Sequence, residues 1–314
     1  MADQDAASTP AVAPHFDLAL TPQEQALIAQ RTPLRFHTYT PANAASTTDP
    51  VLEPYLPLGS PTSSSTSTST TSPLSLILTP PRPQDAAALV STLNDPLVAP
   101  QLVGPPYPYS DELAREFISL KRREAHEVLQ RLAARARREL RRACSGEEQV
   151  AEGEREGDEP LDVAAPWLDE LPLCVIRRAD TGEYVGDFGV HRWLFEDVVD
   201  AEERGRLVRE NEAKKASDPS ALWSFGFYLR PSFHGHGIMA HVLRSVLDSF
   251  LFSYLGIDEV CGSAFADNVA SVRTQEKCGL RRYGGYERVV SASRGGGVRS
   301  MVVLKVTRAD FARR

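Results

Sequence analysis

The chain has 314 residues, of which 42% are hydrophobic, and its formal net charge at pH 7 is −7. The length allows one large domain or two ordinary ones, and the composition is sufficient for a packed core. The sequence contains no run of about 18 apolar residues, so we expect no membrane partner, and the net negative charge disfavours a dedicated nucleic-acid binder.

The four cysteines, Cys144, Cys174, Cys261 and Cys278, lie far apart in the sequence. Their spacing is that of neither a disulfide framework nor a zinc site, so we expect no metal. The first residues lack the basic and apolar segments of a secretory signal, which predicts a cytoplasmic location, with a nuclear one as the alternative.

Residues 1–73 are predicted to form a variable, largely disordered N-terminal region. Residues 60–72 consist almost wholly of Ser and Thr, a composition that buries too little apolar surface to become ordered, and we interpret them as a linker. Within the region, Thr21-Pro22 favours the start of a short helix that reaches Gln30, and residues 35–39 favour a strand.

The folded domain is predicted to span residues 74–308. A strand at 74–78 precedes a helix that ends near Leu93, because Pro96 disfavours helical geometry in the residue before it. Ser110 offers an N-cap for a long helix through Ala143, whose basic outer face we interpret as solvated. An exposed acidic insertion follows near 145–165, and a second, charged insertion lies near 196–220, with a helical segment at 196–216.

Two short apolar runs, 173–177 and 184–190, flank a turn with Asp180 and Gly182 and predict a hairpin. Residues 222–229 predict another strand, and the turn after it contains Gly235 and Gly237 and opens into an apolar helix. Because the first amides of a helix have no partner within it, this turn is suited to bind a phosphate group.

The remaining segments predict a strand at 259–265, a helix at 268–277 that ends at Gly279, and two strands at 283–290 and 300–306. From residue 74 on, the predicted order is strand-helix-helix-strand-strand-strand-helix-strand-helix-strand-strand. This order is typical of a mixed α/β layered domain rather than of a repeat array or a helix bundle.

Two segments carry a resemblance to the GNAT superfamily of N-acetyltransferases, and most of all to its ribosomal-protein N-terminal acetyltransferase branch (RimJ/RimL type). His234–Met239 stands where the family has Gln/Arg-x-x-Gly-x-Gly/Ala, and Asn268–Leu280 is similar to the family's Asn-x-x-Ser helix. The resemblance covers residues 74–306. It implies an α/β (α+β) fold with a mixed, mostly antiparallel central sheet, splayed fourth and fifth strands, and helices on both faces.

The resemblance also implies the reaction, which is transfer of an acetyl group from acetyl-CoA to a primary amine of a protein N-terminus or a small molecule. The amine would attack the thioester directly in a ternary complex, and backbone amides near Leu229 would meet the developing oxyanion. Asn268 would hydrogen-bond the pantetheine arm and Ser271 would lie near the thioester. The residues implied to bind acetyl-CoA are Phe227, Tyr228, Leu229, His234, Gly235, His236, Gly237, Ile238, Met239, Asn268 and Ser271.

The proton-transfer residues stay open at this stage. Ser224 stands where many relatives have a glutamate, and Gln275 where other branches have a tyrosine that acts as a general acid. The candidates for proton transfer are Asp187, His191, His236 or a chain of waters, and Asp187 completes a predicted catalytic set with Ser271 and Asn268. The alternative function is a non-catalytic acyl-CoA-binding or scaffold protein with a degenerate site. A kinase-like phosphate binder is disfavoured because no Gly-x-x-x-x-Gly-Lys-Ser/Thr motif occurs.

Overall fold

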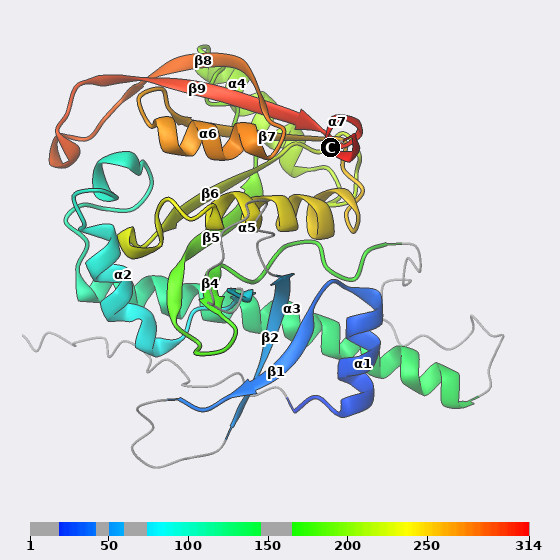
Figure 1. The fold of residues 1–314 in the computed structure, drawn as a ribbon. Coiled ribbons are helices and arrows are strands. Elements are labelled where there is room, and N and C mark those ends of the chain that lie inside the picture. The colour runs from blue at the N-terminus through cyan, green and yellow to red at the C-terminus, as the bar shows by residue number, and fades with distance from the viewer. Residues whose placement is uncertain (1–18, 42–49, 60–73, 146–164, 314) are drawn as a thin grey trace, which may run out of the picture.

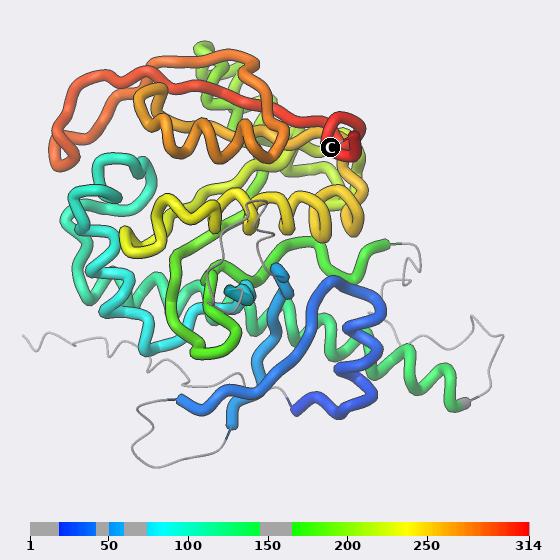
Figure 2. Tube along the Cα trace, viewed as in Figure 1, coloured from blue at the N-terminus to red at the C-terminus, as the bar shows by residue number. Residues whose placement is uncertain are grey.

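The computed structural model describes residues 19–41, 50–59, 74–145 and 165–313, and these form one sheet with helices packed against it (Figures 1 and 2). The strands are β1 (Arg35–Tyr39), β2 (Val51–Gly59), β3 (Leu76–Thr79), β4 (Val175–Arg178), β5 (Tyr184–Arg192), β6 (Trp223–Leu229), β7 (Glu259–Phe265), β8 (Arg281–Val289) and β9 (Val298–Thr307). The helices are α1 (Pro22–Arg31), α2 (Ala86–Leu93), α3 (Asp111–Ser145), α4 (Ala201–Glu212), α5 (Ile238–Val246), α6 (Val269–Lys277) and α7 (Arg308–Ala312).

The nine strands have the order β1-β2-β3-β4-β5-β6-β7-β9-β8. Every neighbouring pair is antiparallel except β6 and β7. The expected mixed, mostly antiparallel α/β sheet is therefore confirmed. The predicted strands and helices of residues 74–308 are all present, with ends displaced by a few residues.

The two central strands part from each other. β6 pairs with β5 along its full length, from Trp223 to Leu229, whereas its parallel pairing with β7 is limited to Trp223 and Val260. Beyond that pair, no strand from the described residues lies on the β7-facing edge of β6. The splayed pair that the resemblance implied is thus present, and it opens toward the carboxyl ends of both strands.

Helices cover both faces of this part of the sheet. Phe225 and Leu229 of β6 pack in the same core as Val242 and Val246 of α5, and α6 joins this core through Val272. On the opposite face, a second cluster holds apolar residues of α2 and α3 together with Cys174, Val175 and Tyr184, and Tyr228 packs against it. Residues of β6 therefore alternate between the two faces, as strand geometry requires.

The described segments before residue 74 belong to the same sheet, which corrects the predicted start of the folded unit. The predicted helix and strand of this region are present as α1 and β1. β2 was not expected, yet it pairs with both β1 and β3 and buries Leu56 and Leu58 in the core. Prolines at positions 54 and 57 argue against a strand in the sequence, because proline has no amide hydrogen to donate to a neighbouring strand. The predicted linker at 60–72 and most of the insertion at 145–165 lie outside the described residues.

Buried ion pairs join β2 to the rest of the fold. Glu53, whose side chain is fully buried, accepts two hydrogen bonds from Arg82, at 2.8 and 3.1 Å, and His37 lies 3.0 Å from it. Asp85 and Arg177 form a second buried pair beside it. Because an unpaired buried charge is costly, these contacts hold the N-terminal strands in place.

The basic face of α3 is largely engaged within the chain. Arg137 pairs with Glu24 of α1 at 2.8 Å, and Arg131 pairs with Glu170 at 2.8 Å. Arg122 is buried and donates to the carbonyl of Pro81. These contacts use much of the positive charge to pack α3 against neighbouring segments.

Candidate active site

The turn between β6 and α5 has the geometry of an anion site. Gly235 and Gly237 have φ values of +79° and +72°, a left-handed conformation that favours glycine. Gly237 is the N-cap of α5, and no side chain caps that helix. The first turn of α5 also carries no acidic residue. Its leading amides therefore face an open approach at the positive end of the helix dipole.

His234 fastens this turn to the end of β6. Its Nε2 lies 2.9 Å from the carbonyl oxygen of Leu229, and because a carbonyl oxygen can only accept, the ring nitrogen donates. The side chains of Ile238 and Met239 are buried in the core beneath α5. The bulk of Met239 therefore does not crowd the turn, and these two residues present only their backbone amides.

The edge of β6 predicted to pair with pantetheine is exposed to the gap beside β7. The ring of Phe227 is stacked on Phe188 and Phe225, with centroids 6.3 and 5.9 Å apart, so this edge is rigid. Leu229 is buried against α5, and Tyr228 points to the opposite face. The three residues thus offer a fixed line of backbone groups along the gap.

Asn268 and Ser271 form the first turn of α6, at the same edge of the sheet as the start of α5 (Figure 1). The Oδ1 atom of Asn268 accepts from the amide of Ser271 at 3.0 Å, so Asn268 caps the helix and keeps its Nδ2 as a donor. The Oγ atom of Ser271 accepts from Gln275 at 3.4 Å. Gln275 itself is buried under β7 and is not placed to act as a general acid.

Asp187 is the one predicted proton-transfer side chain that joins a cluster of polar groups, on the strand beside β6. It lies opposite Tyr228 on the neighbouring strand, and its Oδ2 is buried without a hydrogen-bond partner among the described residues. Burial raises the pKa of Asp187 to about 7, although the Cys174 thiol and the charge of Lys121 oppose the rise. A carboxyl with this pKa can accept a proton near neutral pH.

The phenol groups of Tyr184 and Tyr228 meet beside Asp187, at 3.3 Å. Burial raises the pKa of both well above its ordinary value, and the charge of Asp187 adds to the rise, so both stay protonated. Cys174 and Tyr184 were missed in the sequence because only the strand register brings them to Asp187. His191 and His236 lie elsewhere, since His191 bonds the carbonyl of Arg192 and His236 is exposed in the turn.

Two arginines bridge the tip of the β8–β9 hairpin and the loop after α2. Arg294 donates to the carbonyls of Ala99 and Pro105, and Arg299 donates to the carbonyl of Pro100 at 2.6 Å. The guanidinium carbon of Arg299 also lies over the ring of Phe265 at the end of β7, 3.6 Å from its centroid. The hairpin tip and the loop lie at the edge of the sheet where α5 and α6 begin (Figure 1).

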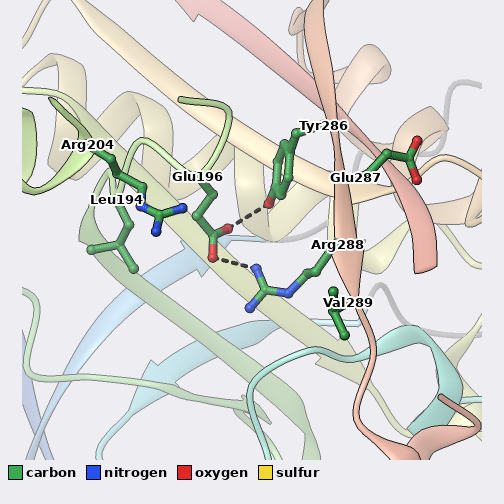
Figure 3. Close-up of a pocket in the computed structure, with 7 residues that line it drawn as sticks. All are labelled: Leu194, Glu196, Arg204, Tyr286, Glu287, Arg288 and Val289. Carbon is green, nitrogen blue, oxygen red and sulfur yellow. Dashed lines mark hydrogen bonds and ion pairs between the residues drawn. The ribbon is translucent and has the colours of Figure 1, made fainter. Parts of the chain in front are cut away.

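A hollow of about 450 Å³ lies between β8 and the segment that leads into α4 (Figure 3). It is lined by Leu194, Glu196, Arg204, Tyr286, Glu287, Arg288 and Val289. Glu196 accepts from the phenol of Tyr286 at 2.7 Å and from Arg288 at 2.5 Å. These bonds outweigh burial and lower the pKa of Glu196, while burial and the bond to Glu196 raise the pKa of Tyr286 to about 12.

Within the described ranges, no three His, Cys, Asp or Glu side chains are grouped so that they could hold a metal ion. None of the helices in those ranges has the length and apolar character needed to cross a membrane.

Comparison with solved structures finds acetyltransferases at low identity. A GNAT-family acetyltransferase from Bacillus anthracis is 12% identical, with a TM-score of 0.45 and coverage of 74% of this chain and 95% of that one. Mycobacterium smegmatis RimJ in complex with CoA-disulfide is 16% identical, with a TM-score of 0.43 and coverage of 74% and 82%. Ribosomal-protein-S5-alanine acetyltransferase from Vibrio fischeri is 10% identical, with a TM-score of 0.42 and coverage of 75% and 94%.

No curated protein matches the sequence. The family model described as "Acetyltransferase (GNAT) domain" matches residues 75–281, which is more than half of the chain. This chain therefore belongs to the GNAT acetyltransferase family.

Proposed function

We propose that this protein is an acetyl-CoA-dependent N-acetyltransferase that acts on a primary amine, either a protein N-terminus or a small molecule. The observation that carries the proposal is the parting of β6 from β7 after Trp223 and Val260, next to the uncapped start of α5. An extended pantetheine arm fits such a gap, and a pyrophosphate fits such a helix start.

In this proposal, the β6 edge from Phe227 to Leu229 pairs with the pantetheine arm, and the amides from Gly235 to Met239 hold the pyrophosphate. The Nδ2 atom of Asn268 is available to bond the arm, since its Oδ1 is occupied by the helix cap. Ser271 lies one turn farther along the same helix. The binding groups thus come from β6, from the turn that leads into α5, and from the start of α6.

The acetyl transfer is proposed to run through Asp187 and Tyr228. The neutral amine attacks the thioester carbonyl, a C–N bond forms, and Asp187 accepts the proton that the nitrogen loses. The C–S bond breaks, and Tyr228 donates a proton to the leaving thiolate. The support for these roles is the raised pKa of Asp187, its position opposite Tyr228, and the protonated state of that phenol.

The second candidate is a non-catalytic acyl-CoA-binding protein. It is favoured by Ser224, which is buried where many relatives have a glutamate, and by the buried Gln275. Turnover separates the two: the purified protein is incubated with acetyl-CoA and a panel of N-terminal peptides and polyamines, and free CoA is measured. We expect amine-dependent release of CoA. CoA binding without release from any amine would favour the non-catalytic protein.

A further inference from the structure

The hollow beside β8 lies at the same edge of the sheet as the proposed acyl-transfer site. Tyr286 of β8 stands opposite Met301 of β9, and Met301 stands opposite Phe265 at the end of β7. Tyr286 is thus two strands from Phe265, or about 10 Å at the usual strand spacing. The carboxyl ends of β6, β7 and β8 all point to this edge (Figure 1).

The hollow also lies on the face where the proposed catalytic side chains project. Trp223 and Val260 are paired, so five residues later Tyr228 and Phe265 project to one face. Phe265, Met301 and Tyr286 pack together in one cluster, which places Tyr286 on that face too. The hollow and the Asp187–Tyr228 pair therefore lie on the same face of the sheet, where α2 and α3 pack against Tyr228.

Two carboxylates, of Glu196 and Glu287, and two guanidinium groups, of Arg204 and Arg288, line the hollow, and of these four groups Arg204 has no partner among the described residues. Glu196 is occupied by Tyr286 and Arg288, and Glu287 accepts from Ser300 at 2.7 Å and points away from the hollow in Figure 3. Arg204, from α4, reaches into the hollow. Its guanidinium makes no ion pair or hydrogen bond with any residue of the described segments, so it is available to an anionic group.

The rim of the hollow is apolar and exposed. Leu194 is 44% exposed and Val289 is 79% exposed, and they stand on opposite sides of the charged centre. An occupant therefore meets a cation at the centre and apolar surface around it. A polypeptide segment with an acidic side chain matches this arrangement better than a polycationic small molecule does.

We infer that the hollow binds a carboxylate of the acceptor through Arg204, and that the acceptor is a polypeptide with Asp or Glu at its third or fourth position. The inference rests on the proposed function. An extended chain spans at most about 3.3–3.6 Å per residue, so three residues cover the roughly 10 Å between Phe265, at the end of β7, and Tyr286. Glu196 holds Tyr286 and Arg288 in place at the floor, and Arg204 supplies the contact that selects the acidic side chain.

The test compares peptides that differ only by Glu or Gln at the third or fourth position. For the full-length protein, we expect kcat/KM to favour the Glu peptide about tenfold, a typical effect of a charge-assisted hydrogen bond. Arg204→Ala should bring this ratio close to one while activity on the Gln peptide is kept. Arg209→Ala, the same change at an exposed position of the same helix, should leave the ratio unchanged. A ratio near one in the unaltered protein, or an undiminished one in Arg204→Ala, would overturn the inference.

A binding measurement separates this inference from the proposed function. N-acetylated forms of the same two peptides, labelled at the C-terminus, are titrated by fluorescence anisotropy without acetyl-CoA. Tighter binding of the Glu peptide that depends on Arg204 would support the inference that the hollow binds an acidic side chain. If this binding is found but no amine is acetylated, the proposed function fails and the inference about the hollow stands. If peptides are acetylated but the Glu peptide is preferred neither in kcat/KM nor in binding, the proposed function is supported and the inference that the hollow selects an acidic side chain is wrong.

Discussion

Asp187 of β5 lies directly opposite Tyr228 of β6, and the two face the same side of the sheet. Burial raises the pKa of Asp187 from 3.8 to about 7 and the pKa of Tyr228 well above 10.0. Near neutral pH, the carboxylate can therefore accept a proton, whereas the phenol holds one. The pair can therefore contain a base and an acid at the same pH.

Replacement of Asp187 tests the base. We expect Asp187→Asn to lower kcat by about 10²- to 10⁴-fold, the usual contribution of general acid–base catalysis, with little change in the Kd for CoA. Stopped-time assays of CoA release and calorimetry give the two values. Asp180→Asn is the matched control, since Asp180 is exposed in the turn before β5 and pairs with Arg178. Full activity of a folded Asp187→Asn protein would exclude this residue as the base.

The pH dependence follows from the same carboxyl. With a pKa of about 7, Asp187 is protonated in acid, so kcat/KM should rise with pH through about 7. In Asp187→Asn, this rise should disappear, leaving only the titration of the substrate amine. A profile that is the same in both proteins would assign the rise to another group.

Stability should respond to pH in the opposite direction. The pKa of Asp187 is higher in the folded protein than its ordinary value of 3.8, so the folded state holds the proton more tightly. The stability that this proton contributes is complete below about pH 4 and is lost as pH rises through about 7. Asp187→Asn, which is always neutral, should therefore have the higher Tm at pH 8. A lower Tm at pH 8 would contradict the burial of an uncompensated carboxylate.

A charge placed at the start of α5 tests the phosphate site. The Gly237 Cα faces open space, so Gly237→Glu has room for its side chain at the cost of about 1–2 kcal/mol of backbone strain. We expect calorimetry to find CoA affinity reduced at least tenfold, because the carboxylate repels the pyrophosphate. Gly59→Glu is the control, with the same φ of +72° and open space at the end of β2. Equal CoA affinity in the two folded variants would move the site elsewhere.

The buried pair of Glu53 and Arg82 is expected to stabilise the fold. Glu53→Gln leaves the Arg82 guanidinium buried without its counterion, which should lower the free energy of unfolding by about 3–5 kcal/mol. Urea denaturation followed by circular dichroism measures this loss. Glu139→Gln, which breaks the exposed pair with Arg31, should cost no more than about 1 kcal/mol. Similar losses in both variants would mean that burial does not matter here.

The part of the site that lies within one continuous stretch was predictable from the sequence. The strand, turn and helix from Trp223 to Val246 follow one another directly, and hydrophobic spacing with glycines marks each of them. The cap that joins Asn268 to Ser271 is local in the same way. Each of these features depends on neighbours within a few residues, so the pattern is complete in the sequence.

The rest depends on pairing between distant segments. Asp187 meets Tyr228 through the register of β5 and β6, and Cys174 joins them from the position just before β4. Composition and periodicity carry no information about this register. β2 was missed for a related reason, because its prolines mask a strand that exists through its pairing with β1 and β3. Arg204 reaches the hollow only because the 196–220 insertion folds back over β8.

The arginine bridge between the hairpin tip and the loop after α2 closes a ring around the gap. Hydrogen bonds run from β6 through β5 and β4 to β3, and the chain continues from β3 through α2 to the loop. Arg294 joins the loop to the hairpin, and β9 and β7 lead back to Trp223. A molecule inside a closed ring must enter with a free end or a slender tip. Under the proposed function, an acceptor polypeptide would therefore have to reach the gap by its N-terminus, because the middle of a folded chain would need the bridge to open.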